Sequence, residues 1–261
     1  MRLISLYFEF LRLNVRASLE YRADFLIGVL STVLMQGGQL LALGLVMRQV
    51  PALRGWSLDE VLLMFGLITA ARSLNHMFGD NLWRLGWLYV RTGDFDRFLL
   101  RPINPLFHFI ADRFCQDGVG YLLVALGLIV KASLGLHLLW TPLMLLCAAG
   151  AVLGGGLIFF GVNLITACSA FWITESLPVT LGAFMTHEFA QYPLSLYGRG
   201  VTLVLTFALP YGLISFYPAQ AISRGEFGVL AWTAPLAGLV LTTLGSWVWG
   251  RGLKRYGSSG S

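Results

Sequence analysis

Charged residues are scarce in this sequence. Asp, Glu, Lys and Arg together make up 12% of its 261 residues, whereas soluble domains carry roughly 25%. Four stretches contain no charge at all: 25–47, 132–174, 200–223 and 227–250. A helix of about 20 apolar residues crosses a membrane, and the alternating segments of roughly ten residues that build a membrane β-barrel are missing. The sequence therefore predicts an all-α integral membrane protein that crosses the bilayer several times.

Motifs that bind nucleotides or metals are missing as well. The sequence has only two lysines, Lys131 and Lys254, and neither follows the pattern G-x-x-x-x-G-K-[ST] that cradles nucleotide phosphates. The three cysteines are scattered and form no C-x-x-C pair, which favours a packing role. The stretch "HEFAQY" lacks the second histidine of the zinc motif H-E-x-x-H. We therefore expect no cofactor in this chain, and any nucleotide must be bound by another chain.

Acidic residues are lacking well inside the predicted spans. A secondary transporter driven by an ion gradient would place paired acidic residues there. An intramembrane enzyme would gather acid, base or metal-binding groups at one depth. Neither pattern is present, so the sequence disfavours both classes, and they stay open as alternatives.

The hydrophobic runs predict six membrane spans, and the basic residues predict their orientation. Lys and Arg collect on the cytoplasmic side of membrane proteins. Thirteen basic residues lie on the face that carries both termini and segment 80–116, against three on the other face. Both termini are therefore predicted to be cytoplasmic. The predicted spans are 25–47, 60–79, 118–138, 143–170, 200–218 and 228–250.

Two regions outside regular spans have their own patterns. The first 22 residues predict an amphipathic helix that lies in the headgroup plane. Segment 171–199 is ambiguous between an interfacial helix and a half-buried re-entrant piece. Pro210 and Pro218 predict a kink or a short re-entrant helix at the outer end of the fifth span.

A charged segment, "RTGDFDRFLLRPINPL" (91–106), lies between the second and third predicted spans. Phe95, Phe98 and Leu99 stand at i, i+3 and i+4, so they share one face of a short helix that ends at Pro102. A helix of barely two turns is marginal alone and must lean on a surface. Lipid headgroups and a groove on a cytoplasmic partner are both open alternatives for that surface.

Two charges of this segment are spaced to interact. Asp94 and Arg97 stand three positions apart, which suits an ion pair on one helix face. Thr92 or Asp94 can also cap the start of the helix, where a carboxylate meets the positive end of the helix dipole. The predicted helix is therefore apolar on one side and charged on the other.

Polar residues also interrupt two of the predicted spans. Arg72, Asn75 and His76 form a patch at i, i+3 and i+4 of the second span. This patch indicates a subunit interface or a pathway lining, with a snorkelling arginine as the alternative. Lys131 lies in the third span, roughly 10 Å from its outer end. It either snorkels to the interface or takes part in a pathway or a charge pair.

Several stretches resemble the permease subunits of ABC-2 type transporters. They are "GWSLDEVLLMFGL" (55–67), "GDFDRFLLRPINPL" (93–106), "YPLSLYGRGVTLVLTFALPYGLISFYPAQAI" (192–222) and the terminal "RYGSSGS". The second resembles the pattern LDRFLLRPLNPL of a bacterial branch of that family, with Ile103 where the branch often has Leu. The similarity extends over nearly the whole chain.

The resemblance implies a single transmembrane domain, 1–261, with an interfacial helix at 1–24 and a cytoplasmic coupling segment at 80–116. It implies a non-enzymatic subunit of an exporter in the bacterial inner membrane. Membrane lipid is an expected partner, and nucleic acid is not, because the basic residues cluster at the ends of the predicted spans. The expected partners are two ATP-binding subunits, which hold ATP and magnesium, and a second permease, either a distinct homologue or an identical copy. By position, the residues expected to couple the chain to the ATP-binding subunits are Asp94, Phe95, Asp96, Arg97, Phe98, Leu99, Arg101 and Pro102.

Overall fold

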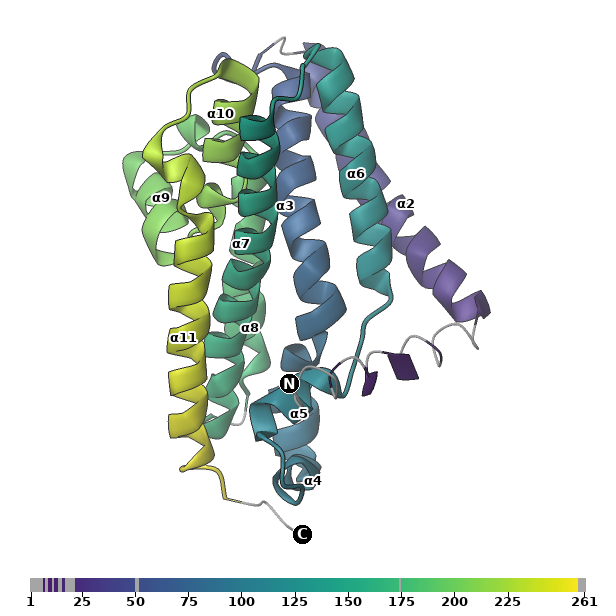
Figure 1. Ribbon diagram of the computed structural model, residues 1–261, viewed down its shortest axis with the longest axis vertical. Helices are drawn as coiled ribbons and strands as arrows, with labels where there is room; N and C mark the ends of the chain where they lie inside the picture. Colours follow the sequence, from purple (N-terminus) through teal and green to yellow (C-terminus); the bar gives the residue numbers. More distant parts are fainter. Residues whose placement is uncertain are drawn as a thin grey trace.

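A computed structural model gives the architecture of the chain (Figure 1). It describes residues 7, 9–10, 12–13, 16, 22–49, 52–173 and 175–257. Throughout these ranges the elements are helical, no strand forms, and one isolated bridge joins Leu53 to Trp56. The predicted all-α class is therefore confirmed.

Among the described residues, four helices are long and apolar enough to cross a membrane, and a bent pair, Arg199–Ala208 with Tyr211–Arg224, makes a fifth candidate if it is one span. The four helices correspond to the first four predicted spans. Most are close to the predicted bounds, but the second continues well beyond the predicted end at residue 79. The four stretches are Phe25–Gln49, Leu58–Val90, Asp117–Gly135 and Pro142–Phe171.

These stretches belong to a bundle in which α3 (Leu58–Gly79) is central (Figure 1). In the most apolar part of the stretch Leu58–Val90, which begins with α3, 78% is buried within the chain. In the corresponding part of α2 (Arg22–Gln49), only 17% is buried. α6 (Asp117–Gly135) and α7 (Pro142–Ala167) pack against α3. The other described residues therefore leave most of the apolar surface of α2 uncovered.

The second span is longer than predicted because α3 does not stop at its polar end. It continues as a 3-10 turn, η1 (Asp80–Arg84), and then as a π-helix, η2 (Leu85–Val90). Leu82 and Leu85 of this extension are fully buried, so apolar packing holds the helix together past its charged residues. α7 similarly continues into a 3-10 turn, η3 (Cys168–Phe171). Both extensions reach the end of the bundle where the C-terminal helix also ends (Figure 1).

The region after α7 differs from the predicted single span at 200–218. Short helices alternate with breaks, and the apolar stretches Arg199–Ala208 and Tyr211–Arg224 meet at an angle of 77°. The break contains Pro210, where a kink was predicted, because proline cannot continue a helix interior. The elements are α8 (Leu177–Met185), η4 (Thr186–Gln191), η5 (Leu194–Leu196), α9 (Arg199–Leu203), η6 (Val204–Ala208), η7 (Tyr211–Leu213), α10 (Phe216–Arg224) and η8 (Val229–Trp232).

The final helix, α11 (Ala234–Leu253), runs beside α7 (Figure 1). It starts later than the predicted sixth span, 228–250, whose first residues form η8 instead. α11 is not among the four clearly apolar stretches, since it contains the charged Arg251 in its last turn as well as Thr242, Thr243 and Ser246. The two helices touch at glycines: a Cβ on Gly161 would stand 2.7 Å from the backbone carbon of Leu241.

The predicted N-terminal amphipathic helix lies largely outside the described residues. The six that are described, Tyr7, Glu9, Phe10, Arg12, Leu13 and Arg16, are helical, and Glu9, Arg12 and Arg16 are exposed. Two of them contact α5 (Pro105–Ala111): the ring of Tyr7 lies 6.1 Å from that of Phe107, and the ring of Phe10 lies 6.0 Å from that of His108.

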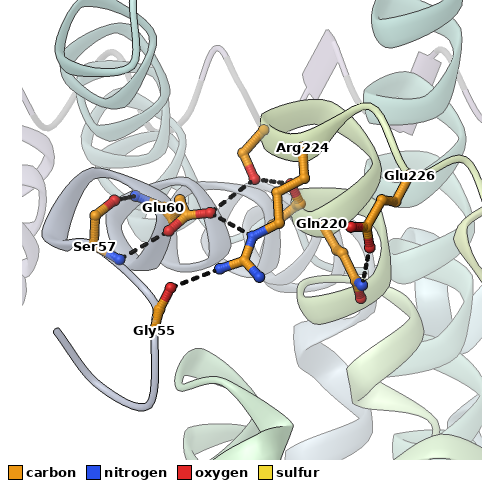
Figure 2. A network of polar contacts seen from close by, with 8 residues as sticks. Gly55, Ser57, Glu60, Gln220, Arg224 and Glu226 are labelled. Carbon is orange, nitrogen blue, oxygen red and sulfur yellow. Dashed lines mark hydrogen bonds and ion pairs between the residues drawn. The ribbon is translucent and has the colours of Figure 1, made fainter.

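At the opposite end of the bundle, a set of polar contacts fastens α10 to the start of α3 (Figure 2). We call it the Arg224 clamp; it comprises Gly55, Trp56, Ser57, Glu60 and Arg224. Arg224 Nε donates to Glu60 Oε1 at 2.7 Å, and its Nη2 donates to the Gly55 carbonyl at 2.9 Å. The guanidinium also lies 3.8 Å from the centre of the Trp56 ring, a cation–π contact.

Glu60 also belongs to the cap of α3. Its Oε2 accepts from the Ser57 backbone N–H at 2.8 Å, while the Ser57 Oγ accepts from the Glu60 N–H at 3.3 Å. This reciprocal pattern is a capping box, which satisfies two free N–H groups of the first helical turn. The carboxylate of Glu60 thus holds both the helix start and the helix α10.

Replacing Arg224 with alanine is expected to destabilise the protein by about 2 kcal/mol, because the nearly buried Glu60 carboxylate would lose its charged donor. Thermal unfolding of the detergent-purified protein measures this effect. The matched control is Arg48→Ala, which removes an exposed arginine from the same end of the bundle. Equal melting temperatures for the two variants would show that the clamp contributes nothing to stability.

Candidate functional site

The charged segment after the second span forms α4 (Asp96–Leu99), a single helical turn at the end of the bundle (Figure 1). Phe95 and Phe98 point into the protein, and both are fully buried. The predicted apolar face is therefore present, but it leans on the chain itself rather than on lipid or a partner. Leu99, predicted on the same face, is 43% exposed.

The surface on which α4 leans is an aromatic cluster, which we define as Tyr89, Phe95, Phe98, Phe109, Phe171 and Trp249. The ring centre of Phe95 lies 5.6 Å from that of Phe171 and 5.7 Å from that of Trp249. The Phe98 ring meets Tyr89 and Phe109 edge-on at 5.4 and 5.1 Å. Such edge-to-face pairs add to the gain from apolar burial.

This cluster brings together the ends of three long helices. Tyr89 comes from η2 at the end of α3, Phe171 from η3 at the end of α7, and Trp249 from α11. Phe109 comes from α5. A displacement of α4 therefore acts on three helices that run the length of the bundle.

Polar contacts fix α4 from outside the aromatic cluster. Arg97 Nη2 lies 2.7 Å from Asp112 Oδ2, and its guanidinium lies 4.7 Å from the centre of the Phe98 ring. The predicted pair of Arg97 with Asp94 is therefore wrong, because Arg97 turns toward α5. Asp94 instead accepts from the Thr92 hydroxyl at 2.7 Å, within the turn that precedes α4.

The C-terminal residues also contact α4. The Tyr256 hydroxyl donates to Asp96 Oδ1 at 2.9 Å, and its ring lies 5.1 Å from that of Phe95. Burial, together with this hydrogen bond, raises the pKa of Tyr256 to about 12. The tyrosine therefore keeps its proton, and hence its donor role, throughout the physiological pH range.

The part of the charged segment directly after Phe98 is exposed. Leu100 is 84% exposed, and Leu99, Arg101 and Pro102 beside it are exposed as well. Arg101 Nη1 lies 3.4 Å from His108 Nε2, and burial and the Arg101 charge lower the pKa of this histidine. We call Leu99 to Pro102 the tip: two leucines and an arginine projecting from a fixed base.

Leu100 was not among the predicted site residues. The helical spacing singles out the face of Phe95 and Phe98, and Leu100 lies off that face. The signal that marks it is a second leucine directly before Arg101 and Pro102, in a segment too short to bury both leucines.

A second polar site lies inside the bundle, where we define the Arg72 cluster as Arg72, His76, Tyr121 and His187. Arg72 donates to the Tyr121 hydroxyl at 3.0 Å and to His76 Nε2 at 3.4 Å, and its Nη1 lies 3.4 Å from His187 Nε2. The guanidinium also lies 4.4 Å from the centre of the Tyr121 ring. The cluster joins α3, α6 and η4.

The geometry assigns the histidine tautomers. His187 Nδ1 lies 2.6 Å from the Phe184 carbonyl and must donate to it, so its Nε2 is free to accept from Arg72. His76 Nδ1 lies 3.3 Å from Asp80 Oδ1, which leaves its Nε2 as the acceptor in the same way. Asp80 in turn pairs with Arg113 at 3.3 Å. A polar path thus runs from η4 through α3 to the charged end of the bundle.

Two other predicted residues lie apart from this cluster. Asn75, expected beside Arg72 and His76, faces a groove toward α7. Lys131 lies near the end of α6, where its Nζ is 3.9 Å from Asp59 Oδ1 in the first turn of α3. The lysine therefore has an intrachain charge partner, and it lies at the opposite end of α3 from the Arg72 cluster.

These features define a class: a helical membrane protein whose long spans converge on a short, exposed, basic tip. The model of a protein family described as ABC-2 family transporter protein matches residues 33–260. The chain belongs to this family, which makes it a membrane permease, the transport subunit of an ABC transporter that works with an ATPase partner. No match was found among curated proteins or among solved structures.

Proposed function

We propose that this chain is the permease of a bacterial ABC exporter, in which two copies of a partner chain hydrolyse ATP and a second permease completes the pathway. ATP and magnesium would be bound by the partner chains, because this sequence has no phosphate-binding loop. The outward direction is carried over from the family resemblance described above.

The observation that carries this proposal is the exposed tip on its buried base. An isolated turn such as α4 cannot hold a position on its own, yet Phe95 and Phe98 fix it to three long helices. A partner that grips Leu99, Leu100 and Arg101 would therefore move those helices rather than bend a loop. The tip and its buried base would then move as one unit, whose shape and position depend on Asp94, Asp96, Arg97 and Pro102.

The distribution of basic residues supports the orientation. The end with the tip carries Arg84, Arg91, Arg97, Arg101 and Arg113, together with the basic end of α11. We therefore propose that this end and both termini are cytoplasmic. The Arg224 clamp then lies on the outer side, where it holds α10 against α3.

We also propose that α11 crosses the membrane and that 171–224 supplies the remaining crossing, giving six in all. α11 lies against α7, which is one of the four clearly apolar spans. α8 lies beside the half of the bundle that ends in the tip, and α9 and α10 lie beside the opposite half (Figure 1). The Arg72 cluster would transmit movement of α3 to η4.

The mechanism is a change in the relative stability of two conformations. When ATP draws the two ATP-binding subunits together, their grip on the tip favours one tilt of the bundle, and hydrolysis favours the other. A cavity between two permeases would then open to alternate sides. Arg72 and His76 would take part as a joint between segments rather than as ligands of the cargo.

Gentle purification of the tagged chain from its native membrane tests the proposal, with mass spectrometry to identify the proteins that accompany it. We expect an ATP-binding chain at a ratio of one per permease chain, and either one permease sequence or two. A chain that arrives without an ATP-binding partner, even after cross-linking in the membrane, would contradict the proposal.

A further inference from the structure

A groove of about 510 Å³ opens on the side of the bundle between α3 and α7, with Ile110 of α5 at one end. This volume lies within the range of ligand sites, roughly 300–1,000 Å³. Its walls are almost wholly apolar, and two glycines allow it to be deep. The residues that form its floor and walls include Leu74, Phe78, Gly79, Gly156 and Phe160.

One polar side chain, Asn75, lines this groove. It is only 2% exposed, and neither its Nδ2 nor its Oδ1 has a hydrogen-bond partner among the residues that the structure describes. Its Oδ1 lies 2.9 Å from the position that a Cβ of Gly79 would occupy, directly over this wall of the groove. A buried amide normally has partners, so the missing partner is expected to come from a ligand.

The depth of Asn75 indicates the kind of ligand. It lies five residues before Asp80, which is about 7 Å along the helix, and Asp80 pairs with Arg113 at the charged end of the bundle. Because guanidinium groups pair with phosphate, Arg113 would place this ion pair at the level of the lipid phosphates. Asn75 would then lie about one and a half turns deeper than the phosphates, near the ester groups that join them to the acyl chains.

The rim of the groove is apolar and exposed. Leu153 is 63% exposed and Phe78 is 36% exposed, and both lie on its rim. These side chains would meet acyl chains at this depth of a membrane protein. An acyl chain can thus enter sideways without crossing a polar surface.

We propose that the groove binds one glycerophospholipid of the leaflet on the α4 side, with an acyl chain along α7 and an ester carbonyl accepting from Asn75 Nδ2. Asn75 Oδ1 then accepts from the water that accompanies the ester group. The site is distinct from the tip, and it makes the bilayer's own lipid a structural ligand of the permease.

The test uses the full chain in nanodiscs of phosphatidylethanolamine and phosphatidylglycerol that contain a phosphatidylglycerol with a diazirine in its acyl chain. Illumination is expected to label peptides of α3 and α7 that line the groove. Asn75→Leu, which keeps the size and removes the amide, should reduce labelling about tenfold, the factor that one hydrogen bond is worth. Leu153→Trp, at an exposed position, should reduce labelling by blocking the mouth.

Asn75→Leu is also expected to leave the melting temperature in detergent unchanged or raised, because it removes a buried amide without partners. Labelling that is spread evenly over all lipid-facing helices, or that neither substitution changes, would overturn the proposal. So would a disulfide between two copies of the Leu153→Cys variant in the membrane, because that result would show a second permease at this groove.

Discussion

Replacing Leu100 with aspartate is expected to reduce ATP-driven transport at least tenfold while leaving the fold and membrane insertion intact. Leu100 is 84% exposed, so the chain itself loses no packing when its side chain changes. The partner that we propose at the tip would have to bury the new carboxylate, and burying an unpaired charge is costly. Transport and substrate-stimulated ATPase activity in proteoliposomes with the partner subunits measure the effect.

The matched control is Leu139→Asp. Leu139 is 87% exposed, like Leu100, but it lies in the connection between α6 and α7 at the opposite end of the bundle. We expect wild-type coupling in that variant. Equal activity of the two variants would mean that the tip is not where the ATP-binding subunits act, whatever their identity.

The same comparison explains why Phe98 is a poor test of coupling, although it lies in the predicted segment. Phe98 is fully buried in the aromatic cluster, so its replacement with alanine would cost about 3–5 kcal/mol through the cavity it leaves. Any loss of transport would then reflect loss of the base of the tip. The exposure of a side chain distinguishes a residue that can contact the partner from one that holds the tip in place, and the sequence alone does not give that exposure.

The sequence predicted where the four long apolar helices lie, because each contains an apolar run of about the length that a bilayer demands. It did not predict that the second continues to Val90. It left segment 171–199 ambiguous and predicted a fifth span at 200–218 with a kink at Pro210, where the structure has two apolar stretches that meet at 77°. There, contacts between distant residues decide the path: the Ser215 hydroxyl donates to the Ala190 carbonyl, and Tyr211 is fully buried. The pattern of neighbouring residues cannot predict such contacts, because the partners are distant in sequence.

In the candidate site too, the sequence predicted the local structure but not the contacts between distant residues. Spacing alone placed Phe95 and Phe98 on one face, and it correctly indicated that this face must be covered. It could not indicate that Trp249 and Tyr256 would cover it from more than 150 residues away in sequence. The spacing of Arg72, Asn75 and His76 likewise suggested one patch. In the folded chain, the angle between successive side chains turns Asn75 toward α7 and the other two toward α6 and η4.

Replacing Gly154 with alanine is expected to separate α11 from α7 and to destabilise the protein by about 3 kcal/mol or more. A Cβ at Gly154 would stand 2.3 Å from the backbone nitrogen of Pro235 and 2.5 Å from the carbonyl carbon of Ala234. Backbone atoms cannot move aside as a flexible side chain can, so the helices must part. Melting of a fluorescent fusion, followed by size-exclusion chromatography, reports both the stability and the dispersity of the variant.

Gly150→Ala, one turn earlier on the same helix, supplies the control. The nearest atom to its added Cβ would be Pro235 Cγ at 3.8 Å, an ordinary contact, and alanine favours the helix more than glycine does. That variant should therefore melt at or above the wild-type temperature. If Gly154→Ala melted with it, α11 would not pack on α7 at this point. The sixth crossing that we propose, which depends on α7 because α11 is the less apolar helix, would then lack its main support.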